Sequence, residues 1–220
     1  MLTIIFCLPG KMFSNNFLLS WSEVLVKCYQ NNINPIIINR CDSNVYYVRN
    51  KCLCGDLTKG KNQPLFNGHK YDYIMWIDSD QVFKFSDLVA LLNRDLDVVS
   101  GIYLMDPGKF YAVVEDWNKD FFKKNGFFKF LSKEDVDNYK KTKNNLLEVS
   151  YCGLGFMLIK KNIIEKLEYP WFSPEWEEFT PEIREFMSED VGFCQKLIKN
   201  NVKIHVDLNV IVGHEKTHIL

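Results

Sequence analysis

Two carboxylates stand one residue apart in Asp78-Ser79-Asp80, directly after the apolar run of residues 73–77. In an extended segment, side chains two positions apart point to the same face, so Asp78 and Asp80 can converge on one divalent cation. A strand that ends in this way delivers acidic groups to the edge of a sheet. The spacing therefore indicates a metal site, with an ordinary turn as the alternative interpretation.

The same Asp-x-Asp spacing occurs twice more, at Asp95 with Asp97 and at Asp135 with Asp137. Asp95 and Asp97 lie in a polar connection. Asp135 and Asp137 lie in a charged stretch that is typical of a solvated surface, a cap or a helix face. Only the first pair follows a strand apolar enough to be buried on both faces, where ionised groups are costly unless paired or bound to metal. Context thus favours the first pair.

A further pair of acids, Glu189 and Asp190, follows Ser188 and opens a segment whose apolar residues recur at helical spacing. Ser188 is a suitable N-cap and places both acids in the first helical turn, where the helix dipole favours negative charge. The structural interpretation is a well-capped helix. The functional interpretation uses the same physics, because a helix start keeps a carboxylate ionised, as a general base requires.

The elements that must position these acids alternate between strand and helix in the first half of the chain. Strands are predicted at residues 1–8, 35–38, 73–77 and 98–103, and helices at 17–28 and 86–92. This order implies a parallel sheet of doubly wound type, in which ligands lie at the carboxyl ends of the strands. Leu8-Pro9-Gly10, Asn39-Arg40 and Asp78-Ser79-Asp80 all fall at that end.

Residues 104–147 lose regular periodicity and interleave Lys, Asn and Phe. This stretch is interpreted as an irregular insertion with local hairpins, or as an aromatic-lined surface for a second substrate. Order returns at residues 148–159, where Gly153 and Gly155 indicate either a close approach of the backbone to a ligand or a bend. A strand pair near 202–212 then leads into His214.

Composition excludes several classes of protein. The chain has 220 residues, of which 47% are hydrophobic, and this predicts a globular protein with a substantial core. The formal net charge of −1 and the lack of a Lys/Arg-rich run exclude a broad nucleic-acid-binding surface. Neither a membrane-spanning run nor a signal peptide is recognised, so a cytoplasmic location is expected. The oligomeric state is left open.

Seven cysteines are scattered along the chain without a Cys-x-x-Cys pair. Several lie inside apolar runs, which predicts buried free thiols in a reducing compartment. Cys52 and Cys54 with His69 form a weaker alternative, a zinc cluster whose spacing matches no common site. The thiols are therefore not expected to build a disulfide framework.

Taken in order, these features resemble the GT-A glycosyltransferases, which move a sugar from a nucleotide-sugar donor to an acceptor. The resemblance covers nearly the whole chain, and its compact size is similar to that of short viral or bacterial members. It rests on the first strand–helix–strand unit, Asp78-Ser79-Asp80, Gly153-Leu154-Gly155, Glu189-Asp190 and the late His214.

The resemblance implies a fold of the α/β class, with a GT-A-like (Rossmann-like), mixed, mainly parallel central sheet flanked by helices. It also implies a single domain over residues 1–220. Residues 1–103 would be the nucleotide-binding half, and residues 104–220 would be the acceptor-binding and catalytic half.

The resemblance further implies roles for individual residues. Asp80 and Asp78 would hold Mn²⁺ or Mg²⁺ against the donor's diphosphate, and His214 would complete the coordination, with His205 and His218 as weaker candidates. Asp190 would be the base of an inverting transfer, with Glu189 as the fallback. Contacts to the nucleotide sugar are expected from Leu8, Pro9, Gly10, Arg40, Asp42, Arg49, Asp78, Ser79, Gly153, Gly155 and Lys216.

The activity implied is a metal-dependent hexosyl transfer from a UDP-sugar, with hexose and deoxyhexose equally open, to a saccharide acceptor. An acceptor-side loop is expected within residues 171–178. The first strand ends in Leu8-Pro9-Gly10-Lys11, where many relatives carry Pro-Thr or Pro-x-Tyr-Asn, and this departure leaves donor recognition open. The alternatives are a metal-dependent phosphoryl or nucleotidyl transferase and a non-enzymatic carbohydrate-binding module.

Overall fold

A seven-stranded sheet forms the centre of the computed structural model, which describes residues 1–105, 108–142 and 145–216. Its strands are β1 (Leu2–Pro9), β2 (Ile33–Arg40), β3 (Tyr73–Ile77), β5 (Val98–Ile102), β8 (Leu146–Val149), β10 (Phe156–Lys160) and β13 (Ile204–Ile211). Their order is β2-β1-β3-β10-β5-β13-β8. Only β10 and β8 run antiparallel to their neighbours. The expected fold class is confirmed: α/β, with a mixed, mainly parallel central sheet flanked by helices.

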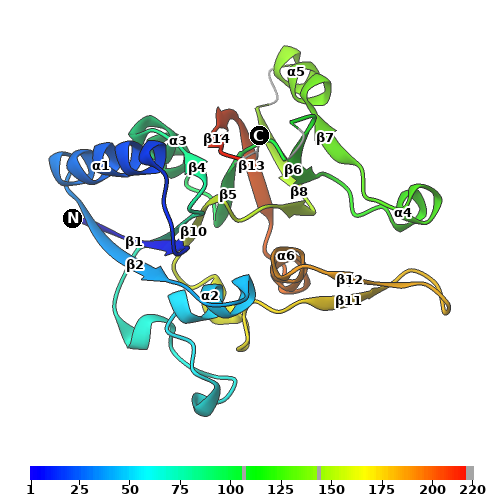
Figure 1. Cartoon of the computed structure of the whole chain (residues 1–220), viewed down its shortest axis with the longest axis horizontal. Coiled ribbons are helices and arrows are strands. Elements are labelled where there is room, and N and C mark those ends of the chain that lie inside the picture. The colour runs from blue at the N-terminus through cyan, green and yellow to red at the C-terminus, as the bar shows by residue number, and fades with distance from the viewer. Residues whose placement is uncertain (106–107, 143–144, 217–220) are drawn as a thin grey trace.

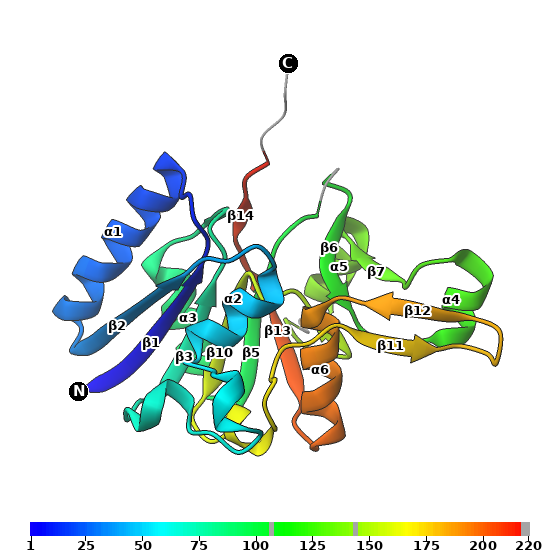
Figure 2. The ribbon, with the colours of Figure 1, turned by 60° about the horizontal axis from the view of Figure 1, so that its bottom comes forward.

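Helices cover both faces of this sheet (Figures 1 and 2). They are α1 (Asn15–Gln30) and α3 (Phe85–Arg94) on one face, and α2 (Val45–Cys52) and α6 (Glu189–Lys199) on the other. Alternation along β1 explains the two layers, because Ile4 and Phe6 join the core under α1 and α3, while Ile5 and Cys7 join the core under α2 and α6. Both faces of β1 are therefore buried.

The predicted strands and helices of the first hundred residues are present, but one helix was not foreseen. The side chain of Ser14 caps α1 and accepts a hydrogen bond from the Phe17 N–H at 3.0 Å. Helix α2 escaped prediction because Arg49, a charged residue, is buried on its inner face between Val48 and Cys52. A buried charge interrupts the apolar pattern by which an amphipathic helix is recognised.

The expectation of an irregular insertion at residues 104–147 is wrong. The stretch contains β6 (Phe110–Val114), α4 (Lys119–Asn125), β7 (Phe130–Ser132) and α5 (Lys133–Lys141), and β6 pairs with β7 and with β9 (Tyr151–Cys152). Elements this short do not build up a visible periodicity. Many of the aromatic side chains pack internally: Trp117 stacks on Phe128 at 3.7 Å between ring centroids, and Phe122 stacks on Phe179 at 4.1 Å.

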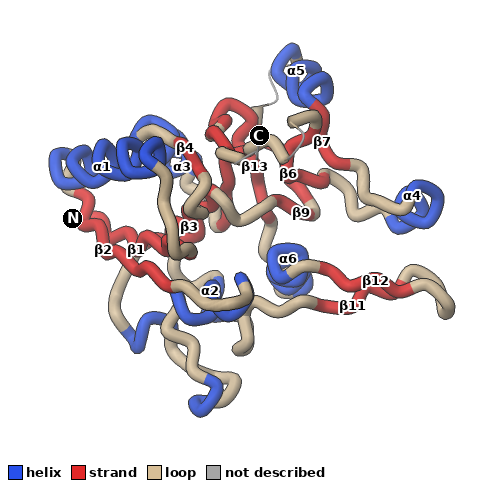
Figure 3. Tube along the Cα trace, in the orientation of Figure 1, coloured by secondary structure: helices blue, strands red, loops and turns tan. Residues whose placement is uncertain are grey.

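Two small ribbons and the last long strand complete the fold (Figure 3). The ribbons pair β11 (Glu175–Glu178) with β12 (Arg184–Met187), and β4 (Gln81–Val82) with β14 (Gly213–His214). Where a strand pair was expected near 202–212, the single strand β13 lies between β5 and β8. Both halves of the chain supply strands to the central sheet. The assignment of nucleotide binding to residues 1–103 and of acceptor binding and catalysis to residues 104–220 stays a prediction.

Several surface features are also clear. Asp135 reciprocally caps α5 with Ser132, which agrees with the capping interpretation of that pair, and Asp95 ends α3 and pairs with Lys160. All seven cysteines are free thiols, and Cys41 is exposed. Across residues 1–105, 108–142 and 145–216, no helix has the length and apolarity needed to cross a membrane.

Candidate functional site

The predicted acids meet at one edge of the sheet. The carboxyl ends of β1, β3 and β5 reach this edge together because these strands run in the same direction. Helix α6 runs back along the sheet before β13, so its amino end returns to the same edge (Figure 2). Residues 78–81 form a tight turn, with the Gln81 N–H donating to the Asp78 carbonyl at 3.1 Å.

Asp80 is held by two cationic side chains from the end of the described chain. Its Oδ2 lies 3.0 Å from His214 Nε2 and 3.1 Å from Lys216 Nζ. Burial on its own would raise the pKa of Asp80, but hydrogen bonds and charge from His214 and Lys216 outweigh burial and lower the pKa to about 2. The hydrogen bond that His214 donates to Asp80 in turn raises the pKa of His214. Asp80 and His214, 134 residues apart in the sequence, thus lie in contact, as a metal site built from these two residues would need.

The His214 ring is oriented as a metal ligand would be. Its Nδ1 lies 2.7 Å from the Leu104 carbonyl, to which an N–H at that position donates, and its Nε2 is directed at Asp80. Asp78 Oδ1 is buried and has no hydrogen-bond partner. In the described ranges, no three His, Cys, Asp or Glu side chains converge as a complete metal cage. Asp80 and His214 nevertheless fit a cation whose remaining ligands are phosphate oxygens of a substrate.

A buried guanidinium joins the turn at 78–81 to the start of α6. Arg49, which is 4% exposed, contacts Asp78 Oδ2 at 3.1 Å and Glu189 Oε1 at 3.2 Å. Its guanidinium also lies 5.5 Å from the Trp76 ring centroid. Burial acts to lower the pKa of Arg49, and the charges of Asp78 and Glu189 outweigh it and raise that pKa. The geometry therefore places Arg49 beneath the site. The prediction that Arg49 contacts the nucleotide sugar is corrected, because its side chain is buried and paired with two carboxylates.

Replacing Arg49 with methionine is expected to lower the free energy of unfolding by about 3–5 kcal/mol, because the buried Glu189 and the partly buried Asp78 lose their counter-charge. Urea denaturation measures the change. Lys203→Met is the matched control, since Lys203 pairs with Glu148 at 2.8 Å on the exposed surface and its loss should matter little. If Arg49→Met were no less stable than Lys203→Met, the stabilising role of the ion pairs from Arg49 to Asp78 and Glu189 would be contradicted.

Asp190 and Glu189 occupy different environments. Asp190 Oδ2 accepts a hydrogen bond from the Tyr151 hydroxyl at 2.8 Å, and Oδ1 accepts bonds from the Val191 N–H and the Ser188 hydroxyl. Glu189 is 7% exposed and is occupied by Arg49. Burial raises the pKa of Glu189 against the lowering effect of Arg49. Of the two acids, Glu189 is paired with Arg49 and Asp190 is not, and the assignment of a base to either stays a prediction.

The segment after β1 lies directly against the Asp78–Asp80 turn. Gly10 has φ of +149°, and a Cβ atom there would stand 2.6 Å from the Cβ of Ser79. The Asn39 side chain donates to the carbonyls of Leu8 and Gly10 at 2.7 and 2.9 Å. This arrangement brings Leu8, Pro9, Gly10 and Ser79 together at the sheet edge, where contact with a nucleotide stays a prediction.

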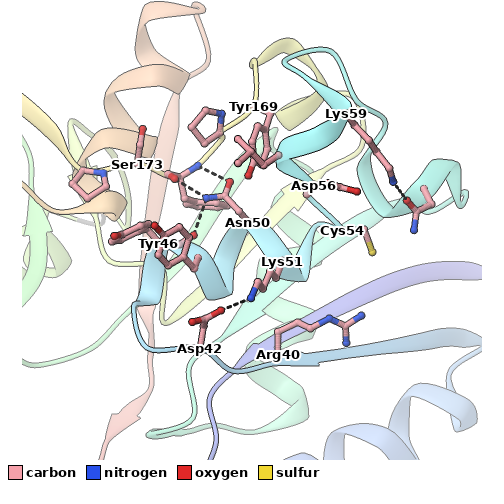
Figure 4. Close-up of a pocket in the computed structure, with 17 residues that line it drawn as sticks. Arg40, Asp42, Tyr46, Asn50, Lys51, Cys54, Asp56, Lys59, Tyr169 and Ser173 are labelled. Carbon is pink, nitrogen blue, oxygen red and sulfur yellow. Dashed lines mark hydrogen bonds and ion pairs between the residues drawn. The ribbon is translucent and has the colours of Figure 1, made fainter.

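Arg40 and Asp42 open onto a cavity of about 900 Å³ on the outer side of α2 (Figure 4). Asp42 is paired with Lys51, and the pKa of Asp42 is lowered by that contact. The rings of Tyr46 and Tyr47, 4.4 Å apart between centroids, belong to the same lining. These two predicted residues thus lie together, but apart from Arg49.

The space beside Gly153 and Gly155 belongs to the protein itself. A Cβ atom on Gly153 would stand 2.0 Å from the Tyr103 hydroxyl oxygen, and one on Gly155 would stand 2.8 Å from the Tyr103 ring. The Gly155 N–H also donates to that hydroxyl oxygen at 3.2 Å. The expectation that these glycines line a ligand is corrected: they make room for a buried tyrosine.

Sequence reasoning missed three contributors, namely Tyr151, Tyr103 and Glu215. Tyr103 packs edge-on against the His214 ring at 5.0 Å, and burial raises its pKa well above the usual value. The Glu215 carboxylate accepts hydrogen bonds from the side chains of Ser14 and Asn16. The backbone N–H of Glu215 donates to the Asp80 carbonyl at 2.8 Å. No local periodicity marks these residues. His205 lies in β13, and His218 lies outside the described residues.

No protein-family model matches the chain, and no curated protein matches its sequence. Its fold is similar to that of three solved structures. GalNAc-T7 with UDP, GalNAc and Mn²⁺ superposes with a TM-score of 0.49 at 10% identity, covering 97% of this chain and 43% of that one. The inositol-1-phosphate CTP transferase of T. maritima gives 0.47 at 11%, covering 98% and 89%.

S. aureus TarS 1–349 gives a TM-score of 0.46 at 13% identity, covering 97% of this chain and 60% of that one. The chain therefore spans less than two thirds of the GalNAc-T7 and TarS chains. Identities this low concern the fold alone, so the function must be inferred from the side chains at the sheet edge.

Proposed function

We propose that this chain is a metal-dependent glycosyltransferase that moves a hexose or deoxyhexose from a UDP-sugar to a hydroxyl of a saccharide, with inversion and Asp190 as general base. Asp78 and Glu189 share one guanidinium, that of Arg49, and this observation carries the proposal. It brings the strand end that precedes Asp80 within one side chain of the helix start that presents Asp190. A cation-binding pair and a carboxylate base thereby share one edge of the sheet.

Asp80 and His214 would hold the cation, and Asp78 lies beside them under the control of Arg49. The cation, Mn²⁺ or Mg²⁺, would neutralise the charge that develops on the departing diphosphate. Lys216, now on Asp80, can turn its ammonium group to the same diphosphate. Because His214 donates through Nδ1 to a carbonyl, its Nε2 is kept in the orientation that coordination needs.

On the acceptor side, Asp190 would take the proton of the attacking hydroxyl. The Tyr151 hydroxyl and the Val191 N–H fix the orientation of this carboxylate, so that the base is placed before the acceptor arrives. Leu8, Pro9, Gly10, Arg40 and Asp42 remain the predicted contacts of the nucleoside. Residues 1–103 would then bind the donor, and residues 104–220 would bind the acceptor and supply the base.

A thermal-shift panel of nucleotides and nucleotide sugars, with and without Mn²⁺, tests this proposal. UDP at about 100 times its Kd should stabilise the protein by about 2.7 kcal/mol and raise Tm by roughly 5 °C, with EDTA cancelling the shift. A panel in which no nucleoside diphosphate changes Tm would contradict the proposal. Release of pyrophosphate from a nucleoside triphosphate and a sugar phosphate would instead support the nucleotidyltransferase alternative.

A further inference from the structure

The β11–β12 ribbon carries an exposed pair of aromatic rings. Trp176 lies opposite Phe186 in the antiparallel register, with 5.1 Å between ring centroids, and the two residues are 58% and 53% exposed. Figures 1 and 2 show the ribbon projecting from the body of the protein beside α6. Aromatic rings left in water on a projecting ribbon indicate a surface that contacts something else.

The opposite face of the ribbon is turned to the protein. Met187 is 8% exposed, and Glu175, its cross-strand partner, contacts Lys196 of α6 at 3.2 Å. Neighbouring side chains on a strand point to opposite faces, so Trp176 and Phe186 point away from these contacts. The ring pair is therefore on the side of the ribbon that the fold leaves open.

The chain after β12 leads from the ring pair to Asp190. Ser188 follows β12 directly and keeps an extended backbone, with φ −63° and ψ 166°, before α6 begins. The hydroxyl of Ser188 contacts Asp190 Oδ1. Two residues of extended chain span about 7 Å, a length close to one sugar ring and its linkage. Only three residues of chain separate Phe186 from Asp190, the carboxylate proposed as base.

The chemistry around the rings fits a neutral hydroxylated ligand. The Arg184 guanidinium lies 4.6 Å from the Trp176 ring centroid, and Glu178 stands opposite Arg184, so polar groups border the apolar rings. Five Glu and one Arg within residues 175–187 disfavour a polyanion such as nucleic acid or an anionic membrane surface. Two rings also offer only a few hundred Å², whereas a stable protein interface buries 1,200 Å² or more in total, roughly.

We infer that Trp176 and Phe186 form a saccharide-binding subsite for the acceptor. A sugar ring adjoining the one that presents its hydroxyl to Asp190 would stack its apolar face on these rings. Arg184 and Glu178 would bind hydroxyl groups at the border. This inference rests on the proposed function, because it identifies the acceptor as a chain of at least two sugars.

The test uses the full chain with UDP and Mn²⁺ and measures binding to a panel of purified hexose oligosaccharides of two to four units, alongside the matching methyl monosaccharides. For every oligosaccharide that the unmodified protein binds, Trp176→Ala with Phe186→Ala should weaken binding about 10- to 100-fold. Trp176→Tyr should stay within about threefold. Phe127→Ala is the control, since Phe127 is 55% exposed on another part of the surface.

The outcomes separate this inference from the proposed function. Failure of UDP to bind contradicts the proposed function, while oligosaccharide binding that depends on Trp176 would still support the subsite. Failure of the unmodified protein to bind any oligosaccharide, or equal binding by the double variant, overturns the subsite even when UDP binds. A change from dimer to monomer in the double variant, with unchanged oligosaccharide binding, would assign the rings to self-association and also overturn it.

Discussion

Asp80→Ala is expected to abolish the Mn²⁺-dependent part of UDP binding, a loss of about 100-fold or more in affinity. The carboxylate of Asp80 is the one that His214 and Lys216 converge on, and its low pKa keeps it ionised at neutral pH. Without it, His214 alone would remain to hold the cation against the diphosphate. Titration calorimetry of UDP, with and without Mn²⁺, measures the effect directly.

The matched control for this variant is Asp97→Ala. Asp97 is the second acid of another Asp-x-Asp pair, Asp95 with Asp97, and lies exposed between α3 and β5. Its loss should therefore leave UDP affinity unchanged. Thermal unfolding of both variants shows whether the fold is retained. If Asp80→Ala bound UDP as tightly as the unmodified protein and still responded to Mn²⁺, Asp80 would not be a metal ligand.

Asp190→Asn is expected to reduce the rate of transfer by about 10²- to 10⁴-fold while UDP binding stays within about twofold. Asparagine has nearly the same shape, and its side-chain oxygen can still accept the hydrogen bond from Tyr151. What the amide lacks is the ability to take a proton from the acceptor hydroxyl. Single-turnover transfer and separate UDP titrations distinguish the lost chemical step from lost binding.

Asp120→Asn is a suitable control for this second variant. Asp120 also lies in the first turn of a helix, α4, but its side chain is 92% exposed and contacts Lys123 of the same helix. It should transfer at the unmodified rate. Normal turnover in Asp190→Asn would remove Asp190 from the role of base, and Glu189, held by Arg49, could not readily replace it.

The sequence pattern predicted secondary structure well where an apolar run or a helical repeat of apolar residues marks the element. The strand at 73–77 was predicted at the bounds of β3, because all but its first residue are buried and it ends in a polar turn. Helix α6 begins after Ser188, as predicted, but the Ser188 hydroxyl donates to Asp190 and makes no capping hydrogen bond to the helix backbone. The short strands and helices of residues 104–147 were missed, because elements as short as β7 (three residues) and β6 (five residues) are too brief for a periodic pattern to be told from chance.

The candidate site was predictable only in part. Asp78, Asp80 and Asp190 could be selected from their positions at a strand end and a helix start. The role of Arg49 was misjudged, because sequence alone does not reveal that its helix packs against β1 and β2 and buries the Arg49 side chain. Gly153 and Gly155 were misjudged for a similar reason, since the ring that fills their space comes from Tyr103, some fifty residues earlier in the chain.

The sequence by itself determined the alternating strands and helices, the buried strand before Asp78 and the acidic start of α6, because these depend on hydrophobic periodicity and capping between near neighbours. Only the tertiary structure decided which groups meet. Arg49 and Glu189 are 140 residues apart, and Asp80 and His214 are 134 apart. Such partners are set by sheet order and side-chain packing, which place distant residues at one edge and which no local pattern records.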